Sequence, residues 1–490
     1  MSDFIFSIRR DGSAQLDEFT GTGPDVIIPS AHEGHPVTAI ADNAFSWHGT
    51  VRSVVIPDSV TVLGEAAFSW CESLVSVDIP DSVKTIGEWC FIGCSALRSV
   101  TIPPLVRKIN YSTFQSCSSL VSVVFPDRLR SIGPEAFSEC HSLASVRLPD
   151  GITSLGDNAF SSCDALQSVN LPDKLTSLGV NVFSGCTALA ELIVSEKHPV
   201  FRVENGVLIN RKEQRLIFHP FTSGAYSYQI PEGVSIISEE AFANRVHLTE
   251  IIIPDSVTVI EEKAFYGCRG LRSVRLPASL TRLGSYAFHG CTSLIEITLP
   301  DSLTTLEYSV FYACSTLVTV RLPASLRIIS SCAFSGCGNL TTINFPEGLL
   351  DIGDSAFEGC RSLDNAVLPD SLETLGAHAF GSCDMLQAIS LGSRLKVIAP
   401  RVFSRCRSLN QVTIPEGLVE IGSEAFVNCS NLLTLQLPES VSVIADDAFD
   451  ECRHLMLFVW PDSPAKQYAM EHDMPFSEVC LFRTVSASAC

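Results

Sequence analysis

The sequence predicts a mainly β repeat solenoid, and two observations carry this prediction. Apolar residues keep fixed distances from a recurring Phe, so each copy of the repeat has the same pattern. No single copy could bury its own apolar residues, whereas stacked copies would bury them jointly. The Phe recurs every 23 residues in two blocks, at 45, 68, 91, 114, 137, 160 and 183, and again at 242, 265, 288, 311, 334, 357, 380, 403, 426 and 449.

Each position of the repeat predicts a local structure. Val274 and Leu276 alternate with polar residues, which predicts a short strand with one buried face, and stacking predicts a parallel sheet. The proline that follows lacks an N–H and ends the strand in a turn. The next apolar pair, Leu280 and Leu283, can form a second row of short strands. The Ala-Phe-x-x-Cys phrase at 264–268 predicts a short helical or 3-10 turn whose Phe and Cys point inward.

Breaks in the period divide the chain into five parts. Atypical segments are expected at both ends, because stacked repeats need a terminal unit that covers the open core. The predicted parts are an N-terminal cap with an irregular first repeat (1–40), a first block of repeats (41–194), an aberrant coil with a hairpin insert (195–230), a second block (231–461), and a C-terminal cap helix and tail (462–490).

Two of these parts carry specific local signals. Asn205 and Gly206 lie between two stretches of alternating apolar residues, which is typical of a hairpin with a two-residue turn. Ser463 followed by Pro464 is typical of a helix N-cap and first helical residue. We therefore expect a hairpin in the insert and a capping helix over 465–472.

The charge of the chain narrows the choice of partner and location. It has 33 basic and 54 acidic residues, a net charge of −21. Such a surface repels phosphates and anionic lipids, so we expect neither nucleic-acid binding nor membrane insertion. The first residues lack the apolar segment of a signal peptide. A cytoplasmic location is therefore expected, with the cell surface or secretion by an unconventional route as the alternative.

The repeat phrase Ile-Gly-x-x-Ala-Phe-x-x-Cys-x-x-Leu-x-x-Val-x-Leu-Pro-x-Ser-Leu resembles the BspA-like class of leucine-rich repeats over roughly residues 26–461. The resemblance implies a right-handed solenoid with a parallel sheet on its concave side. An insert with an Asp/Asn-Gly-Val-Leu hairpin in that family is similar to residues 195–230. Family members are typically bacterial or protozoan surface proteins associated with adhesion to host matrix proteins or to other cells.

A cysteine follows the Phe by three residues in 15 copies, from Cys71 to Cys452. Stacked cysteines would lie about 5 Å apart, within reach of disulfide chemistry. Cysteine is also a small buried hydrophobe, and one per coil is unlike the Cys-x-x-Cys spacing of metal sites. We therefore interpret the row as packing. Cys490 is expected to be the most exposed of the four cysteines outside the row, which are Cys90, Cys332, Cys480 and Cys490.

An acidic residue follows most of the predicted strands, and stacking would align these residues in a row. The row could attract a basic partner or weakly bound Ca²⁺, but turn propensity and solubility explain it as well. Its members are Asp58, Asp81, Asp127, Asp150, Asp173, Asp255, Asp301, Glu347, Asp370, Glu416, Glu439 and Asp462.

The exposed side of the main strands is the predicted protein-binding face. It consists of the residues eight and ten positions after each Phe, which include many Ser and Thr and several Arg but no aromatic rows. The candidate binding residues on this face are Asp78, Thr101, Arg147, Arg275, Arg321 and Asn344. The hairpin turn at Asn205 and Gly206 is a second candidate.

The sequence contains no phosphate-binding Gly-rich loop, no His-Glu-x-x-His motif and no Gly-x-Ser-x-Gly elbow. We predict no catalytic residue, cofactor or metal. The expected function is a non-catalytic, monomeric scaffold for protein–protein interaction through the concave sheet or the hairpin. A surface adhesin is the alternative, and a redox or metal protein that uses the cysteine row is the least favoured interpretation.

Overall fold

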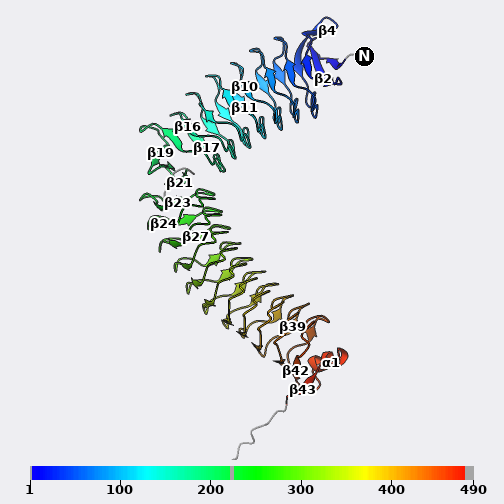
Figure 1. Ribbon diagram of the computed structural model, residues 1–490, viewed down its shortest axis with the longest axis vertical. Coiled ribbons are helices and arrows are strands. Elements are labelled where there is room, and N and C mark those ends of the chain that lie inside the picture. The colour runs from blue at the N-terminus through cyan, green and yellow to red at the C-terminus, as the bar shows by residue number, and fades with distance from the viewer. Residues whose placement is uncertain (1–2, 221–225, 480–490) are drawn as a thin grey trace, which may run out of the picture. The chain divides into compact units, whose positions relative to one another are not determined.

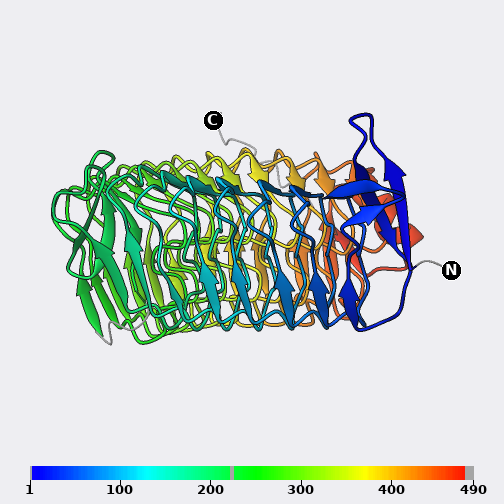
Figure 2. The same cartoon turned by 90° about the horizontal axis from the view of Figure 1, so that it is seen from above.

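The computed structural model describes residues 3–220 and 226–479. The chain forms two compact units, Met1–Gly224 (unit 1) and Ala225–Cys490 (unit 2). Each unit is a stack of short coils, and the strands of successive coils lie side by side (Figures 1 and 2). The predicted mainly β solenoid is therefore confirmed.

The first row of strands follows the Phe of each coil and pairs in parallel. Its register equals the repeat period, as in Ser99↔Ser122 and Val100↔Val123. In unit 1 the row contains β3 (Asp25–Ile27), β6 (Ser53–Val55), β8 (Ser76–Asp78), β10 (Ser99–Thr101), β12 (Ser122–Val124), β14 (Ser145–Val146), β16 (Ser168–Leu171) and β18 (Glu191–Val194). In unit 2 it contains β22 (Ser227–Gln229), β24 (Glu250–Ile252), β26 (Ser273–Arg275), β28 (Glu296–Thr298), β30 (Thr319–Arg321), β32 (Thr342–Ile343), β34 (Asn365–Val367), β36 (Ala388–Ser390), β38 (Gln411–Thr413), β40 (Thr434–Gln436) and β42 (Met456–Val459).

The second row consists mostly of two-residue strands and confirms the shorter row that the sequence allows. These strands also pair in parallel, one coil to the next. In unit 1 they are β5 (His35–Ile40), β7 (Val62–Leu63), β9 (Thr85–Ile86), β11 (Lys108–Ile109), β13 (Ser131–Ile132), β15 (Ser154–Leu155) and β17 (Ser177–Leu178). In unit 2 they are β23 (Ile236–Ile237), β25 (Val259–Ile260), β27 (Arg282–Leu283), β29 (Thr305–Leu306), β31 (Ile328–Ile329), β33 (Asp351–Ile352), β35 (Thr374–Leu375), β37 (Val397–Ile398), β39 (Glu420–Ile421) and β41 (Val443–Ile444).

The Ala-Phe-x-x-Cys segment differs from the predicted helical or 3-10 turn, because it consists of consecutive hydrogen-bonded turns. Two residues per coil have a left-handed backbone, such as Lys263 (φ 53°) and Gly267 (φ 66°), and this conformation interrupts any helix. The N–H of Phe265 donates to Ala287 O in the next coil at 2.8 Å. Backbone N–H groups on this side therefore alternate between bonds within a coil, as from Tyr266 N to Lys263 O at 2.9 Å, and bonds to the next coil.

The core of each unit is a ladder of stacked Phe rings with nearly parallel planes. Centroids of neighbouring repeat Phe rings lie 4.8 Å apart at the closest pair and 6.3 Å at the widest. Burying one such side chain contributes roughly 1.5–3 kcal/mol. Other aromatic rings end each ladder. They are Phe19 and Phe218 in unit 1, and Tyr228 and Tyr468 in unit 2.

Both ends of the chain depart from the repeat. At the N-terminus β1 (Phe4–Ile8) pairs antiparallel with β2 (Ala14–Phe19), and β4 (Ala31–His32) forms a hairpin with β5. The predicted C-terminal helix is present as α1 (Pro464–Glu471), whose N-cap Ser463 accepts from Lys466 N. The last strand, β43 (Phe476–Glu478), pairs with β42. Cys480 and Cys490 lie outside the described residues.

The insert of unit 1 is an antiparallel meander of β19 (Phe201–Glu204), β20 (Val207–Asn210) and β21 (Arg215–Phe218). Asn205 and Gly206 both have positive φ (50° and 83°), as the predicted two-residue turn requires. All four residues of β20 are buried, and the hydrophobic core includes residues of all three strands. The meander therefore packs against the core, and its turn is exposed.

Candidate protein-binding surface

The outward side chains of the first strand row form the candidate surface. Within β26, Val274 is buried while Ser273 and Arg275 are exposed, because successive side chains of a strand point to opposite faces. The other coils follow the same rule. All six residues predicted for this face are exposed, namely Asp78, Thr101, Arg147, Arg275, Arg321 and Asn344.

These six residues do not form one cluster. In unit 1, Asp78 and Thr101 lie on successive coils, and Arg147 lies two coils beyond Thr101. In unit 2, Arg275 and Arg321 are two coils apart. Asn344, on the next coil, is absent from the groove that the two arginines line. The structure therefore brings only two of the predicted residues into a shared site.

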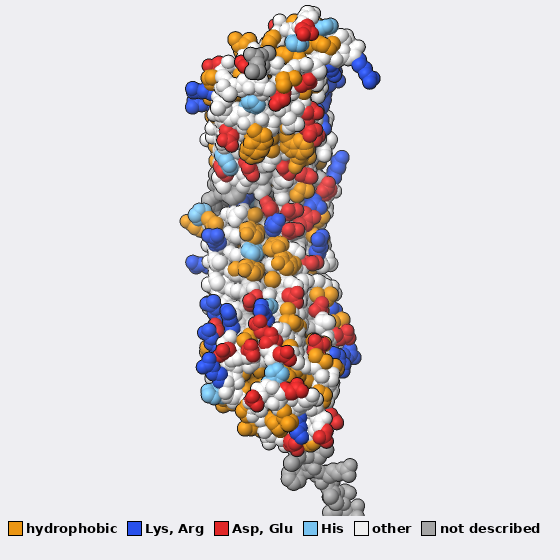
Figure 3. Space-filling model, turned by 90° about the vertical axis from the view of Figure 1, so that its right-hand side faces the viewer, with side chains coloured by type: hydrophobic (Ala, Val, Ile, Leu, Met, Phe, Trp, Pro, Cys, Tyr) orange, Lys and Arg blue, Asp and Glu red, His pale blue; other side chains and the backbone are white. Residues whose placement is uncertain are grey.

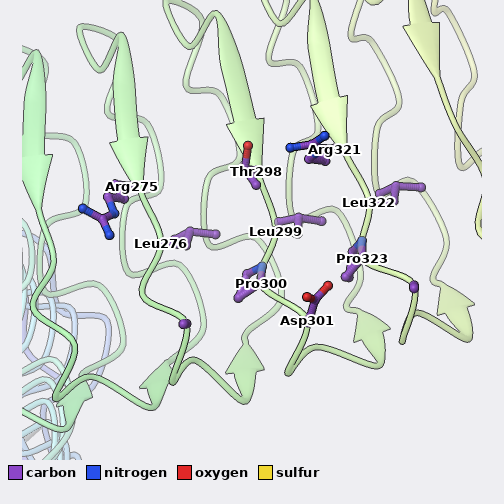
Figure 4. Close-up of a pocket in the computed structure, with 11 residues that line it drawn as sticks. Arg275, Leu276, Thr298, Leu299, Pro300, Asp301, Arg321, Leu322 and Pro323 are labelled. Atoms are coloured by element: carbon purple, nitrogen blue, oxygen red, sulfur yellow. The ribbon is translucent and has the colours of Figure 1, made fainter.

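That site is a groove of about 610 Å³ across three coils of unit 2 (Figure 4). Arg275, Thr298 and Arg321 lie at the ends of three neighbouring strands. Thr298 is the register partner of Arg321, and Ile295 N donates to Arg272 O at 3.2 Å to join the other two coils. The rest of the lining comes from the strand ends and the following turns, and consists of Leu276, Leu299, Leu322, Pro300, Pro323, Ala278, Ala324 and Asp301.

The sequence of the turns explains why a groove opens here. Most coils carry an acidic residue directly after the Pro that ends the strand, but this position holds Ala278 and Ala324 in two of the three coils. Asp301 therefore stands alone between two small residues. The apolar floor is largely buried, with Leu276 7% and Leu299 3% exposed.

The charged groups of the groove are available to a partner. Within the described part of the chain, no salt bridge involves Arg275, Arg321 or Asp301. The two guanidinium groups lie toward the strand side and the carboxylate lies in the turn (Figure 4). Guanidinium groups bind carboxylates in a bidentate manner, and a lone carboxylate binds cations or N–H donors. The groove can thus bind a segment that carries both kinds of polar group around an apolar residue.

Sequence reasoning missed part of this groove. It included Asp301 only as a member of the acidic row, and it did not include Thr298, Ala278 or Ala324. The signal was present, because the turn position changes from acidic to Ala in alternate coils. The other predicted candidate, the turn at Asn205 and Gly206, is exposed at the tip of the insert in unit 1.

The cysteine row has a packing geometry. Each ladder thiol donates to the carbonyl oxygen of the Phe 26 residues earlier, as Cys94 Sγ does to Phe68 O at 3.1 Å. Burial raises the pKa of Cys71, Cys268 and Cys314 to about 12, so these thiols stay protonated. All cysteines in the described residues are free, and those residues contain no group of three or more His, Cys, Asp and Glu suited to a metal.

The acidic row has a local structural role at one member. Asp370 accepts a hydrogen bond from Ser393 N in the next coil at 3.0 Å, and hydrogen bonds from Ser393 hold the pKa of that carboxyl below its usual value. On the face seen in Figure 3, acidic and basic side chains are interspersed with apolar ones. No helix among the described residues has the length and apolar character needed to cross a membrane.

The chain is similar to several leucine-rich repeat proteins of solved structure. The chain is similar to a leucine rich cell surface protein from Faecalibacterium prausnitzii, with 28% identity over 84% of this chain and 93% of that one, and a TM-score of 0.58. A leucine-rich repeat protein from Bacteroides ovatus is 26% identical over 98% and 99% of the two chains, with a TM-score of 0.44. A T. pallidum leucine rich repeat protein is 36% identical over 38% and 88%, with a TM-score of 0.37. The comparison with curated proteins found no match.

The repeat itself decides the family. The profile described as the BspA type leucine rich repeat region matches residues 38–132, 107–212, 221–341 and 327–456. These matches cover most of both units and include the Phe and Cys ladders described above. The chain therefore belongs to the BspA-type leucine-rich repeat family.

Proposed function

We propose that the protein is a non-catalytic scaffold that binds a partner protein through the first strand row, centred on the groove of unit 2. The single observation that carries this proposal is the grouping of Arg275, Arg321 and Asp301, without described salt bridges, around a leucine and proline floor. Buried apolar contact with a few polar groups at its edge is the usual composition of a recognition site. The non-catalytic role is supported by membership of a repeat scaffold family.

Site-specific photo-crosslinking tests this proposal directly. A photoreactive phenylalanine analogue replaces Thr298 at the centre of the groove, and a matched variant carries it at Thr374, an exposed residue of the second row. The proposal predicts that a specific protein is captured from Thr298 and not from Thr374. Capture of the same proteins from both positions, or from Thr374 alone, would contradict it.

A second candidate function, adhesion at the cell surface, is supported by one of the comparisons. The Faecalibacterium prausnitzii protein, which is described as a leucine rich cell surface protein, resembles this chain over most of both lengths. Protease treatment of intact cells separates this candidate from the cytoplasmic location expected from the sequence. Digestion of the protein while a cytoplasmic marker stays intact would support adhesion, and complete protection would exclude it.

A further inference from the structure

A hollow on the second strand row of unit 1 concentrates positive charge in an acidic protein. It has a volume of about 530 Å³ and lies at β9 and β11, in a chain of net charge −21. Four of the seven residues that line it are cations, and all four are exposed. The lining residues are Lys84, Thr85, Leu105, Arg107, Lys108, Asn110 and Arg128.

The hollow coincides with a break in the strand ladder. The coils before the break come close at Gly87, directly after β9, where an added Cβ would lie 2.5 Å from the carbonyl carbon of Gly64. Asn110 holds this position in the next coil, and its Nδ2 donates to Ile86 O at 2.7 Å. The main-chain N–H makes the corresponding bond in the preceding coil, from Gly87 to Leu63 O. In the described structure β9 ends one sheet and β11 begins another.

The acidic row is interrupted at the same place. Pro104 occupies the position that Asp81 and Asp127 hold in the coils before and after it. The following residue, Leu105, is 37% exposed and adds an apolar surface to the hollow. Within residues 3–220, no salt bridge involves the four cations of the hollow. The acidic side chain of the row is therefore absent from the coil in which the basic side chains are concentrated.

We infer that this hollow, the basic hollow, binds a short acidic segment of a partner protein. Adjacent coils of a parallel ladder lie about 4.8 Å apart and an extended peptide rises about 3.3 Å per residue, so the three coils match about three residues. Lysine and arginine side chains can bind two or three carboxylates of such a segment. Leu105 would contact an apolar residue between them.

The flanking charges favour a short acidic segment over a long polyanion. The acidic row continues on both sides, with Asp58 and Asp81 in the coils before the break and Asp127, Asp150 and Asp173 in the coils after it. A nucleic acid or sulfated glycan that extends past the hollow would meet these carboxylates and be repelled. A protein segment can place its charge within the hollow and carry neutral residues beyond it.

The test is a fluorescence anisotropy titration of the full-length protein with the labelled peptide Gly-Asp-Leu-Asp-Asp-Gly. The inference predicts saturable binding that weakens as salt is added, because the interaction is between exposed charges. The same peptide with Asn at the three acidic positions should bind at least about tenfold more weakly. Equal binding of the two peptides would overturn the inference.

Matched variants locate the binding site. Substituting Lys84→Gln, Arg107→Gln and Lys108→Gln together should weaken binding of the acidic peptide about tenfold. Each exposed ion pair is weak on its own, but the three act jointly here. The control combines Arg269→Gln, Arg282→Gln and Arg407→Gln, which removes the same number of charges at exposed residues of unit 2, and should bind like the unchanged protein. Equal loss in both variants would contradict the assignment.

Three further measurements separate a specific effect from the alternatives. Thermal unfolding of the triple variant should match that of the unchanged protein, because the substituted side chains are exposed. The variant Lys84→Glu with Arg107→Glu and Lys108→Glu leaves one cation and three carboxylates in the hollow, so it should reverse the preference and favour Gly-Lys-Leu-Lys-Lys-Gly. A heparin dodecasaccharide that binds while Gly-Asp-Leu-Asp-Asp-Gly does not would overturn the peptide assignment in favour of a sulfated glycan. These outcomes concern unit 1 residues only, so they are distinguishable from failure of the groove proposal.

Discussion

At the scale of single residues, the cysteine of each coil combines two roles. Its side chain fills a fixed slot beside the Phe ladder, and its Sγ–H donates to a Phe carbonyl at 3.0–3.4 Å. A buried carbonyl without a partner would cost about 1–3 kcal/mol. A residue that is small, apolar and able to donate one hydrogen bond suits this position, and cysteine meets all three requirements.

This burial predicts that the protein loses stability at alkaline pH. The pKa of Cys71, Cys268 and Cys314 is about 12 in the folded state, above the ordinary value of 9.0. Below pH 9.0 the thiols are protonated in both states and their contribution is constant. Above it the unfolded thiols ionise first, so the free energy of unfolding falls by about 1.4 kcal/mol per thiol per pH unit.

Urea unfolding at about pH 8 and about pH 10 measures this loss. The control changes Cys71, Cys268 and Cys314 to Ala, which removes three of the buried thiols. The drop in the free energy of unfolding between the two pH values should be smaller in the control than in the unchanged protein. Equal drops would show that other groups cause the alkaline loss.

The Phe ladder leads to a second prediction at this scale. Phe288 is fully buried between Phe265 and Phe311, with ring centroids 5.1 and 5.6 Å away. Replacing Phe288 by Ala would leave a cavity in the stack and lower the free energy of unfolding by about 3–5 kcal/mol. Replacing the exposed Val367 by Ala should change it by less than about 0.5 kcal/mol. Chemical denaturation of both variants provides the comparison.

At the scale of elements, two coils of unit 1 approach each other closely at Gly87, directly after the second-row strand β9. Changing Gly87→Ala would place a Cβ 2.5 Å from the Gly64 backbone and separate two coils. We expect a destabilisation of about 1–3 kcal/mol, as in other overpacked sites. Changing Asn110→Gly should have the opposite structural effect and let β11 pair with β9. Amide hydrogen exchange would then show new protection at Arg107, and unchanged exchange there would contradict this explanation of the break.

The elements also show how far sequence reasoning reaches. The 23-residue period predicted the parallel register, because one coil places each residue beside its counterpart in the next. It did not predict the turn geometry, since the left-handed positions hold Lys263 and Trp70 as well as glycines, and neither residue type signals positive φ. The outward residues were identified from period-two alternation, but the groove depends on the loss of acidic side chains at Ala278 and Ala324. The missing acidic side chains become apparent only when the turns of successive coils are compared with one another.

At the scale of the whole molecule, the two units repeat one construction. Each has a Phe ladder with an aromatic ring at either end and two parallel rows of strands. The repeated residues build the architecture, so any binding specificity lies in residues that vary between coils. The groove of unit 2 and the basic hollow of unit 1 both arise where a turn of the repeat departs from its usual acidic residue. Departures from the repeat are therefore where we locate function.

The most direct test of this claim is the affinity of the partner captured from Thr298, measured by titration calorimetry with full-length protein. The change is Arg275→Ala combined with Arg321→Ala in the groove, and the control is Arg282→Ala combined with Arg407→Ala, two exposed residues of unit 2 outside the groove. The groove variant should bind at least about tenfold more weakly, because truncated arginine anchors typically cost more than 1 kcal/mol each. The control should bind like the unchanged protein. Unchanged affinity in the groove variant would contradict the account.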